Sequence, residues 1–321
     1  MDLSIVIPVY NVAPYLNESL DSIFRQNFGE YEVIVINDGS TDGSLKILNE
    51  YQERYTNMTV LSQANSGQSV GRNVGLEHTC GKYVYFFDSD DILTEEFSRI
   101  TDPVLNNEAD IIIFDADVFE NSIGNGIQQS NDSYKEKVQY LMNEGIKNGL
   151  RSFSFSGVEY LQMIKKSRHY STVVWKRIYK RSFLIENNIR FSPGIIPAED
   201  DLHMFHTLLL NPEMVYFENI AVHHRIRKAS TMSSLNKERS YRSFDVILKE
   251  FIVMKEVFGK SGIEAELIDW MINLFLRRIH TQRPSMKEAR RLLELSKNND
   301  IPVEIKTSVK MFTNLIRITH E

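Results

Sequence analysis

Three carboxylates follow directly on an apolar, aromatic run in the segment YFFDSDDILT, residues 85–94. The run is typical of a buried β-strand, so Asp88, Asp90 and Asp91 stand where that strand ends. Acids at such a place are either turn residues, which bond to their own backbone, or ligands of a cation. Carboxylate oxygens suit Mg²⁺ and Mn²⁺, which bind few protein groups and share the rest of their coordination with substrate phosphates. The segment therefore raises the possibility of a metal site that handles a phosphorylated substrate.

Polar clusters also stand at the ends of other expected strands. They are YN at 10–11, NDGS at 37–40, and Asp115 with Asp117 after the apolar run that starts at 110. In open parallel sheets, ligands bind outside the carboxyl ends of the strands. One acidic turn means little, but several at one rim favour a binding site.

The elements that position these clusters alternate between apolar strands and helical spacing. Strands are expected at 3–9, 31–36, 59–61, 83–87 and 110–116. Helical patterns occupy 14–28, the stretch after 40 and the stretch from about 69, and Asn11 is expected to cap the first. This alternation predicts an α/β fold with a mostly parallel sheet flanked by helices. We expect three regions, at 1–117, 118–235 and 236–321, the last wholly helical.

Composition limits the classes of protein that fit. The 321 residues include one cysteine, Cys80, which excludes an intrachain disulfide and fits a reducing compartment. The first residues, MDLSIVIPVYN, lack a basic n-region and a long apolar run, so we expect no export signal. No uncharged apolar run of membrane-spanning length occurs in the sequence, so we expect no membrane span. We expect a cytoplasmic protein. The ten basic and five acidic residues from Arg277 onward give that end +5, and the rest carries −11 of the net −6. A basic end on an acidic body indicates either an anionic surface as neighbour, at the inner face of the membrane, or a solvated helical face.

Two common nucleotide-binding motifs are absent. No GxGxxG follows the first strand, and no GxxxxGK[ST] occurs in the chain. The usual dinucleotide-binding loop and the P-loop are therefore disfavoured.

The motifs SIVIPVYN, VIVINDGSTDGS, ANSGQSVGRNVGL and YFFDSDD, in this order and spacing, resemble the signature of glycosyltransferase family 2. A second block, VVWKRIYKRSFLIENNIRFSPGIIPAEDDLHMF, is similar to members that build bacterial capsular and other surface polysaccharides. The resemblance covers the first hundred residues closely. It implies a GT-A fold, a UDP-sugar donor and Mn²⁺ or Mg²⁺. Residues 1–117 would then be the nucleotide-sugar-binding half of the GT-A domain, 118–235 its acceptor and catalytic half, and 236–321 an added helical region.

The resemblance also implies donor contacts. Pro8 and Tyr10 would flank the base, with Tyr10 stacked on uracil, or Tyr10 belongs to a packed turn. Asp38 would accept a hydrogen bond from the base, although DGS is also a common turn. Arg72 would lie near the nucleotide, or it ties the carboxylates down structurally. The remaining donor contacts assigned by position are Asn11, Asp88 at the ribose, and Ser89.

DSD matches the family's DXD motif. Asp90 would hold the metal between the donor phosphates, helped by Asp88, while Asp91 is better interpreted as a cap of the helix starting near Thr94. His223 or His224 would complete the metal shell, or both are ordinary surface histidines. Strand alternation lets only one of that pair face the site.

AEDD, residues 198–201, matches the family's Glu-Asp motif at the start of a helix. Asp200 is the expected catalytic base that removes the proton of the acceptor hydroxyl, with Glu199 orienting it or shifting its pKa. Acids are favoured at helix N-termini in any case, so a plain acidic cap is the alternative. One displacement on an α-linked nucleotide sugar gives a β-linked product, the inverting outcome that the resemblance implies.

The strand and basic loop AVHHRIRKASTMSS place Arg225 and Arg227 on one strand face, where they would neutralise the leaving diphosphate. Trp175 and Lys176 are candidates for the acceptor site, within a stretch of seven basic residues and no acid. Those residues are Lys165, Lys166, Arg168, Lys176, Arg177, Lys180 and Arg181. The stretch either meets a lipid-linked acceptor at the membrane or is a solvated face around a core tryptophan.

The sequence thus predicts a metal-dependent, inverting hexosyl- or N-acetylhexosaminyltransferase that extends a surface glycan, with no nucleic-acid partner. The C-terminal helices would contact the membrane or form a homodimer. A nucleotidyltransferase is the alternative enzyme class, but VIPVYNVAPYL lacks the Gly- and Lys-rich triphosphate loop that such an enzyme needs. A sugar- or nucleotide-binding module without activity is the third possibility.

Overall fold

The computed structural model describes residues 1–27, 29–105, 109–120, 143–147, 150–167, 172–195, 199–227, 247, 250–251, 253–258 and 262–281. The chain forms two compact units. The first comprises residues 1–194 and 199–230, and the second comprises 195–198 and 231–321. The predicted polar loop at 121–133, Arg168, and the basic tail beyond 281 lie outside the described residues.

Among the described residues, the first unit contains a ten-stranded sheet with the order β3-β2-β1-β4-β9-β6-β10-β8-β7, and β5 pairs with β10. The strands are β1 (Leu3–Val9), β2 (Tyr31–Asn37), β3 (Met58–Ser62), β4 (Tyr83–Phe86), β5 (Ile92–Leu93), β6 (Ile111–Glu120), β7 (Asn143–Lys147), β8 (Leu150–Ser156), β9 (Arg177–Lys180) and β10 (Glu213–Ile226). The helices are α1 (Ala13–Phe24), α2 (Ser44–Arg54), α3 (Gln68–His78), α4 (Glu96–Leu105), α6 (Gly157–Ser167), the 3₁₀ helix η1 (Val174–Lys176), α7 (Arg181–Glu186) and α8 (Glu199–Leu209).

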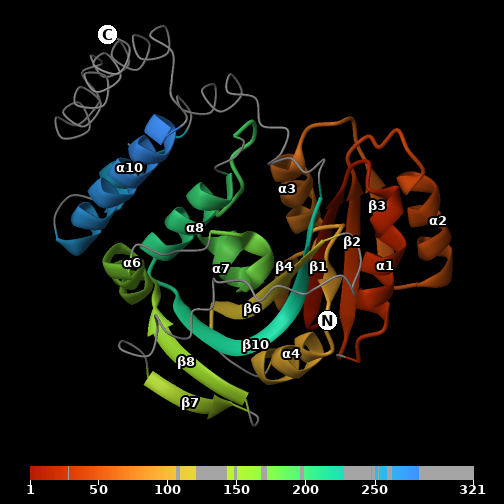
Figure 1. Ribbon diagram of the computed structural model, residues 1–321, viewed down its shortest axis with the longest axis horizontal. Helices are drawn as coiled ribbons and strands as arrows, with labels where there is room; N and C mark the ends of the chain where they lie inside the picture. Colours follow the sequence, from red (N-terminus) through yellow and green to blue (C-terminus); the bar gives the residue numbers. More distant parts are fainter. Residues whose placement is uncertain are drawn as a thin grey trace, which may run out of the picture. The chain divides into compact units, whose positions relative to one another are not determined.

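The first four long strands form the parallel part of the sheet. β1 pairs in parallel with β2 and β4, and β2 with β3. All seven side chains of β1 are buried, as expected for a strand covered on both faces. Helices α1 and α2 lie on one side of these strands and α3 lies on the other (Figure 1). The predicted α/β fold is therefore confirmed, and the predicted β1 agrees in both bounds.

Helix α3 lies unusually close to β1. A Cβ atom on Gly75 would overlap Cγ1 of Val6, whereas one on Gly71 would lie 3.4 Å from Pro8 Cβ, an ordinary contact. Gly75 thus permits the close approach, which brings Arg72 of the same helix against the end of the sheet.

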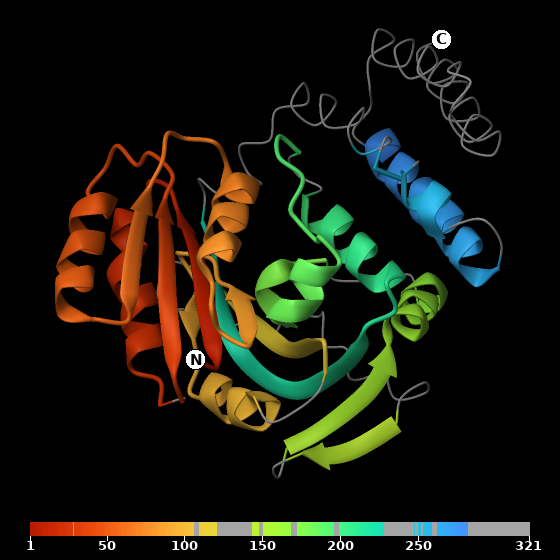
Figure 2. The ribbon, with the colours of Figure 1, turned by 180° about the vertical axis from the view of Figure 1, so that it is seen from behind.

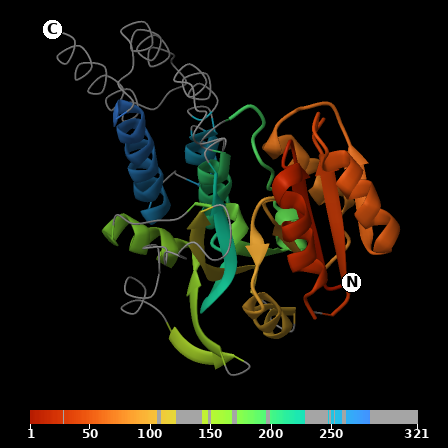
Figure 3. The ribbon, with the colours of Figure 1, turned by 45° about the vertical axis from the view of Figure 1, so that its right-hand side comes forward.

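Beyond β4 the sheet becomes mixed. The short strand β9 runs antiparallel between β4 and β6, and β10 then pairs in parallel with β6. The curved strand β10 also pairs antiparallel with β8, which forms a hairpin with β7 (Figure 2). Helix α4 packs beside β10 (Figure 3). Strand β9 comes after β8 in the chain but lies between β4 and β6 in the sheet. The 3₁₀ helix η1 directly precedes β9, so η1 is placed at the end of these central strands.

Two details of the predicted elements are wrong. The residue before α1 is Val12, and Asn11, at a φ of 52°, instead accepts a hydrogen bond from the backbone N–H of Thr41 at 2.8 Å. Asp115 and Asp117 do not end a strand, because β6 continues to Glu120. Asp115 accepts a hydrogen bond from the Tyr216 hydroxyl at 2.7 Å.

The second unit includes α10 (Ile263–Thr281), in agreement with the helical pattern expected there. Over residues 263–272 of α10, the buried hydrophobic side chains are Leu267, Ile268, Met271 and Ile272. Over the described residues, none of the helices combines the length and the apolar character needed to cross a membrane.

Candidate active site

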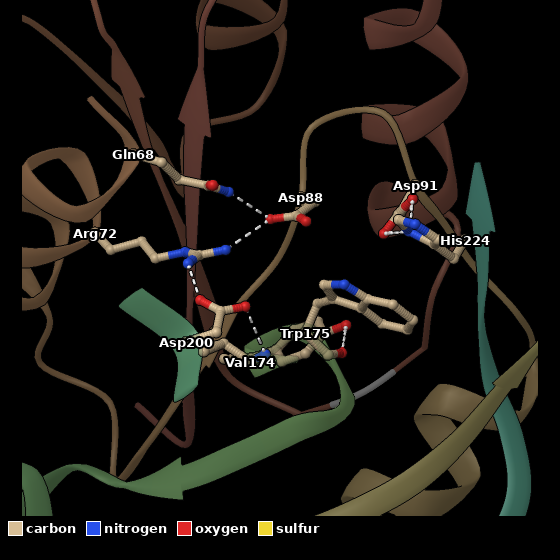
Figure 4. Close-up of polar contacts among 9 residues, drawn as sticks. Gln68, Arg72, Asp88, Asp91, Val174, Trp175, Asp200 and His224 are labelled. Atoms are coloured by element: carbon tan, nitrogen blue, oxygen red, sulfur yellow. Dashed lines mark hydrogen bonds and ion pairs between the residues drawn. The ribbon is translucent and has the colours of Figure 1, made fainter. Parts of the chain in front are cut away.

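The first carboxylate of the DSDD segment, Asp88, is held from α3. Its Oδ1 accepts hydrogen bonds from Arg72 Nη2 at 3.0 Å and from Gln68 Nε2 at 2.9 Å (Figure 4). Gln68 and Arg72 are four residues apart and so share one helix face. Ser89, the next residue, is buried in the turn.

Arg72 connects this turn to a helix start far along the chain. Its Nη1 donates to Asp200 Oδ1 at 2.8 Å, and its side chain is only 2% exposed. The guanidinium lies 5.1 Å from the ring centre of Phe191, which stacks on His203 at 4.0 Å. Burial lowers the pKa of His203 well below its usual value, so the stacked rings of Phe191 and His203 carry no charge. Arg72 therefore holds two carboxylates in place, which is the structural role considered for it as the alternative to a contact with the nucleotide.

Asp200 and Glu199 open α8. Asp200 Oδ2 accepts a further hydrogen bond from the backbone N–H of Val174 in η1, at 3.3 Å. Burial raises the pKa of Asp200, and the Arg72 charge opposes that rise. Burial, with the neighbouring Asp200 charge, raises the pKa of Glu199 to about 7, and Glu199 Oε2 is buried with no hydrogen-bond partner among the residues that the structure describes. Both acids thus have the perturbed pKa values that are common in active sites.

Asp91 is a buried ion-pair partner, so its assignment as a helix cap was wrong. Its carboxylate contacts His224 Nδ1 at 2.9 Å and accepts a hydrogen bond from the Arg225 backbone N–H at 2.9 Å. The capping contact at α4 comes from Thr94, whose Oγ1 accepts from the backbone N–H of Glu96 at 3.2 Å.

The two histidines lie on opposite faces of β10, as strand alternation predicted. His224 stacks on Trp175 at 4.6 Å between ring centres. Burial lowers the pKa of His224, but the Asp91 charge outweighs that effect and raises it to about 9. His224 is therefore a cation at neutral pH. His223 instead contacts Asp117 of β6.

Asp90 pairs with Arg227, just beyond the end of β10. Arg227 Nε lies 2.5 Å from Asp90 Oδ2. Burial raises the pKa of Asp90 to about 7, with Asp91 adding to the rise and Arg227 opposing it.

Arg225 is fixed in the same region. Its Nε donates to the Asp90 carbonyl at 2.8 Å, and its Nη2 donates to Glu18 of α1 at 2.6 Å. Its guanidinium lies over the rings of Tyr15 and Phe119. Arg225 is thus built into the wall of the site, whereas it was expected to be available to a diphosphate.

The residues assigned to the base lie at the ends of β1 and β2. Pro8 is buried within β1, while Tyr10 is 48% exposed. Asp38 is buried, and its oxygens accept hydrogen bonds from Gln63 Nε2 at 2.7 Å and from the backbone N–H groups of Ser66 and Gly67, both at 2.8 Å. Asp38 thereby organises the loop that leads into α3.

The predicted acceptor residues occupy different surroundings from those expected. In Figure 4 the indole of Trp175 lies between the Arg72–Asp88–Asp200 group and the Asp91–His224 pair. Lys176 and Arg177 are 2% and 1% exposed, so these two members of the expected basic surface belong to the interior. The basic stretch therefore does not form one continuous surface.

The chemistry of this region fits a divalent cation only in part. Within the described ranges, no three His, Cys, Asp or Glu side chains are grouped as a ready set of metal ligands. Asp90 and Asp88 still offer carboxylate oxygens two residues apart in one turn. Mg²⁺ and Mn²⁺ are commonly held by one or two carboxylates plus substrate phosphates, so the donor set fits a cation that arrives with a diphosphate.

Sequence reasoning missed several residues of this site. Gln68 was recoverable, because its spacing from Arg72 places both on one face of α3. Glu18, Phe191 and His203 gave no such signal, since each reaches the site only through the tertiary fold.

Comparison with known proteins decides the family. Residues 4–162 match the family model described as Glycosyl transferase family 2. The chain belongs to this family. Among curated proteins, the chain is 33% identical over 194 residues to the "Uncharacterized glycosyltransferase YibD" of Escherichia coli, covering 60% of this chain and 52% of the relative. It is 29% identical over 214 residues to the "Poly(ribitol-phosphate) beta-glucosyltransferase" of Bacillus spizizenii, covering 65% of this chain and 30% of the relative. The chain thus spans about half, or less, of the length of these relatives.

The fold of this family 2 glycosyltransferase is similar to that of S. aureus TarS residues 1–349. With the UDP complex the TM-score is 0.65 at 20% identity, covering 98% of this chain and 83% of that chain. With the UDP-GlcNAc complex it is 0.61 at 20% identity, covering 99% and 92%. The GT-A-like architecture expected from the motifs is confirmed.

Proposed function

We propose that this family 2 glycosyltransferase is metal-dependent and inverting, and that it moves a sugar from a UDP-sugar to a hydroxyl group of a bacterial surface glycan. The observation that carries the proposal is the Arg72 bridge. One buried guanidinium binds both Asp88, in the acidic turn after β4, and Asp200, at the start of α8. A donor-binding turn and a candidate base are therefore held at a fixed separation.

The donor is proposed to be a UDP-sugar. The exposed ring of Tyr10 suits stacking on a planar base, and Asp38 shapes the loop beside it. TarS, which has a similar fold, has been crystallised with UDP and with UDP-GlcNAc. The transferred sugar is a hexose or an N-acetylhexosamine.

Asp90 and Asp88 would hold Mn²⁺ or Mg²⁺. When bound, such an ion neutralises the donor diphosphate and stabilises the charge that develops on the leaving group. The protein contributes Arg227 and protonated His224 to the same charge balance.

The transfer is a single displacement. The acceptor hydroxyl oxygen bonds to the anomeric carbon while the bond from that carbon to the diphosphate oxygen breaks, and UDP leaves with the electron pair. Asp200 takes the hydroxyl proton. Each of its oxygens accepts one hydrogen bond, from Arg72 or from Val174, and a carboxylate oxygen has a second lone pair. Burial raises the pKa of Asp200, which strengthens it as a base.

The acceptor is proposed to be a hydroxyl of a surface polymer, carried on a lipid. One relative bears the name poly(ribitol-phosphate) beta-glucosyltransferase, which supports a polyol or sugar hydroxyl and a β-linked product. The indole of Trp175, between the base and His224, offers an apolar wall to the sugar (Figure 4).

The test uses UDP-glucose, UDP-galactose and their N-acetyl forms with Mn²⁺ and a hydroxylated acceptor. We expect UDP release with one donor and a β-linked product by NMR. Asp200→Asn should lower turnover by at least about 100-fold while donor binding persists, and Asp21→Asn on the outer part of α1 is the control. Retention of configuration would exclude Asp200 as the base of a single displacement. Binding of UDP-sugars without any turnover would indicate a module without activity.

A further inference from the structure

Each of the three carboxylates in the DSDD turn contacts a cation, and Asp88 shares its cation with Asp200. Asp88 pairs with Arg72 at 3.0 Å, Asp90 with Arg227 at 2.5 Å, and Asp91 with His224 at 2.9 Å. Basic side chains of the protein therefore already occupy the acidic turn. A divalent cation that binds to Asp90 Oδ2 competes with the Arg227 guanidinium, because two positive groups at contact distance from one oxygen repel each other.

The three cations differ in their freedom to move. Arg72 is 2% exposed and is held by two carboxylates. His224 belongs to β10 and is stacked on Trp175. Arg227 follows the last residue of β10, its side chain is 19% exposed, and its other described contact is the ring of Tyr15 at 5.6 Å. Among these cations, Arg227 is the one that can leave with the smallest rearrangement.

The neighbouring Arg225 provides a contrast on the same strand face. It is buried, bonded to Glu18 and to the Asp90 carbonyl, and covered by two rings. Arg225 therefore stays in place and keeps the turn in position when Arg227 moves.

We propose that Arg227 is the resident counterion of Asp90, that it must leave Asp90 before the divalent cation binds, and that it then donates to the donor diphosphate. This inference rests on the metal dependence in the proposed function. Without UDP, the metal ion binds Asp90 only by breaking the ion pair between Asp90 and Arg227, so it binds weakly. The metal together with UDP supplies phosphate oxygens that accept hydrogen bonds from the displaced guanidinium. Metal and UDP should therefore strengthen each other's binding by the same factor, as linkage requires.

The experiment measures Mn²⁺ binding to the full chain by electron paramagnetic resonance, with and without UDP. Without UDP, Arg227→Gln should bind Mn²⁺ at least about tenfold more tightly than wild type, since Asp90 is then unpaired. The strengthening of Mn²⁺ binding by UDP should shrink by a similar factor in the variant. Arg227→Lys keeps the charge and should remain close to wild type. Arg151→Gln removes an arginine paired with Glu218 on β10, away from the turn, and controls for the change in net charge.

The outcomes separate the two proposals. If UDP promotes Mn²⁺ binding in wild type but Arg227→Gln binds Mn²⁺ alone no more tightly, the counterion role of Arg227 is wrong and the metal dependence stands. If Arg151→Gln tightens binding as much as Arg227→Gln, a general charge effect replaces the specific one. If neither wild type nor Arg227→Gln binds Mn²⁺ in the presence of UDP, the metal dependence fails and the inference fails with it.

Discussion

Replacing Arg72 with glutamine is expected to destabilise the fold in a way that depends on pH. The change removes a buried charge that serves Asp88 at 3.0 Å and Asp200 at 2.8 Å. Breaking a buried ion pair from one side costs about 3–5 kcal/mol, because the remaining charge is left uncompensated. The carboxylates retain 19% and 21% exposure, so water compensates them in part, and we expect about 3 kcal/mol near neutral pH.

The pH dependence follows from Asp200. Burial raises the pKa of Asp200, and the Arg72 charge opposes this rise more than the hydrogen bond from the Val174 backbone N–H does. Without Arg72 the pKa increases further, so protonation relieves the repulsion at a higher pH than in the wild type. The loss of stability should therefore be smaller at about pH 5 than at about pH 8.

Urea unfolding at both pH values, followed by circular dichroism, measures this difference. Arg72→Lys tests whether charge alone is sufficient, and we expect it to recover only part of the stability because lysine cannot bind both acids with a planar fork. The control is Arg151→Gln, whose ion pair with Glu218 spans 3.3 Å with the arginine 37% exposed, and it should cost at most about 1 kcal/mol. A cost for Arg72→Gln as small as that of the control, or equal at both pH values, would refute the argument.

Three further changes test other parts of the structure. Burial raises the pKa of Glu199 to about 7, so its contribution to stability is fully present below its unfolded pKa of about 4.5 and is lost as the pH rises through about 7. Between about pH 5 and about pH 8, the unfolding free energy of Glu199→Gln should therefore decrease by about 2 kcal/mol less than that of the wild type. An equal decrease in both proteins would contradict this. Gly75→Ala should cost about 1–3 kcal/mol by overlap with Val6, whereas Gly71→Ala in the same helix should be neutral or stabilising by urea unfolding; equal effects would show that α3 can move away from β1. Asp38→Asn should weaken UDP binding at least about tenfold by calorimetry, because it disrupts the loop that Asp38 holds through Gly67 N–H; unaltered binding would exclude that role.

The α/β fold was predictable because its information is local. The strand β1 is apolar except for Ser4, and strands covered on both faces have a mostly apolar composition. The position of the site at the strand ends was predictable for the same reason. The place of β9 was not, because a strand inserted antiparallel between β4 and β6 depends on pairings with distant segments.

Individual roles were predictable only where the deciding contact was local. Asp91 has the sequence signal of a helix cap, but its partner is His224. Lys176 and Arg177 have the composition of a surface, yet both are buried. Charged residues are rarely buried unless they are paired, so the sequence alone favours the exposed alternative. Only the tertiary partners reverse that preference.

The ion pairs that close the site join residues separated widely in the chain. Arg72 and Asp200 are 128 residues apart, and Asp91 and His224 are 133 residues apart. During synthesis, a nascent chain that has just completed the DSDD turn contains neither the candidate base nor the cations of Asp90 and Asp91. Contacts between such distant residues form slowly, since a long loop must close before they contribute. A fragment ending at residue 117 would carry the polar strand ends of β1, β2 and β4 without these partners. We expect it to bind UDP less tightly than the full chain, so that the proposed UDP binding would develop only after β10 and α8 are in place.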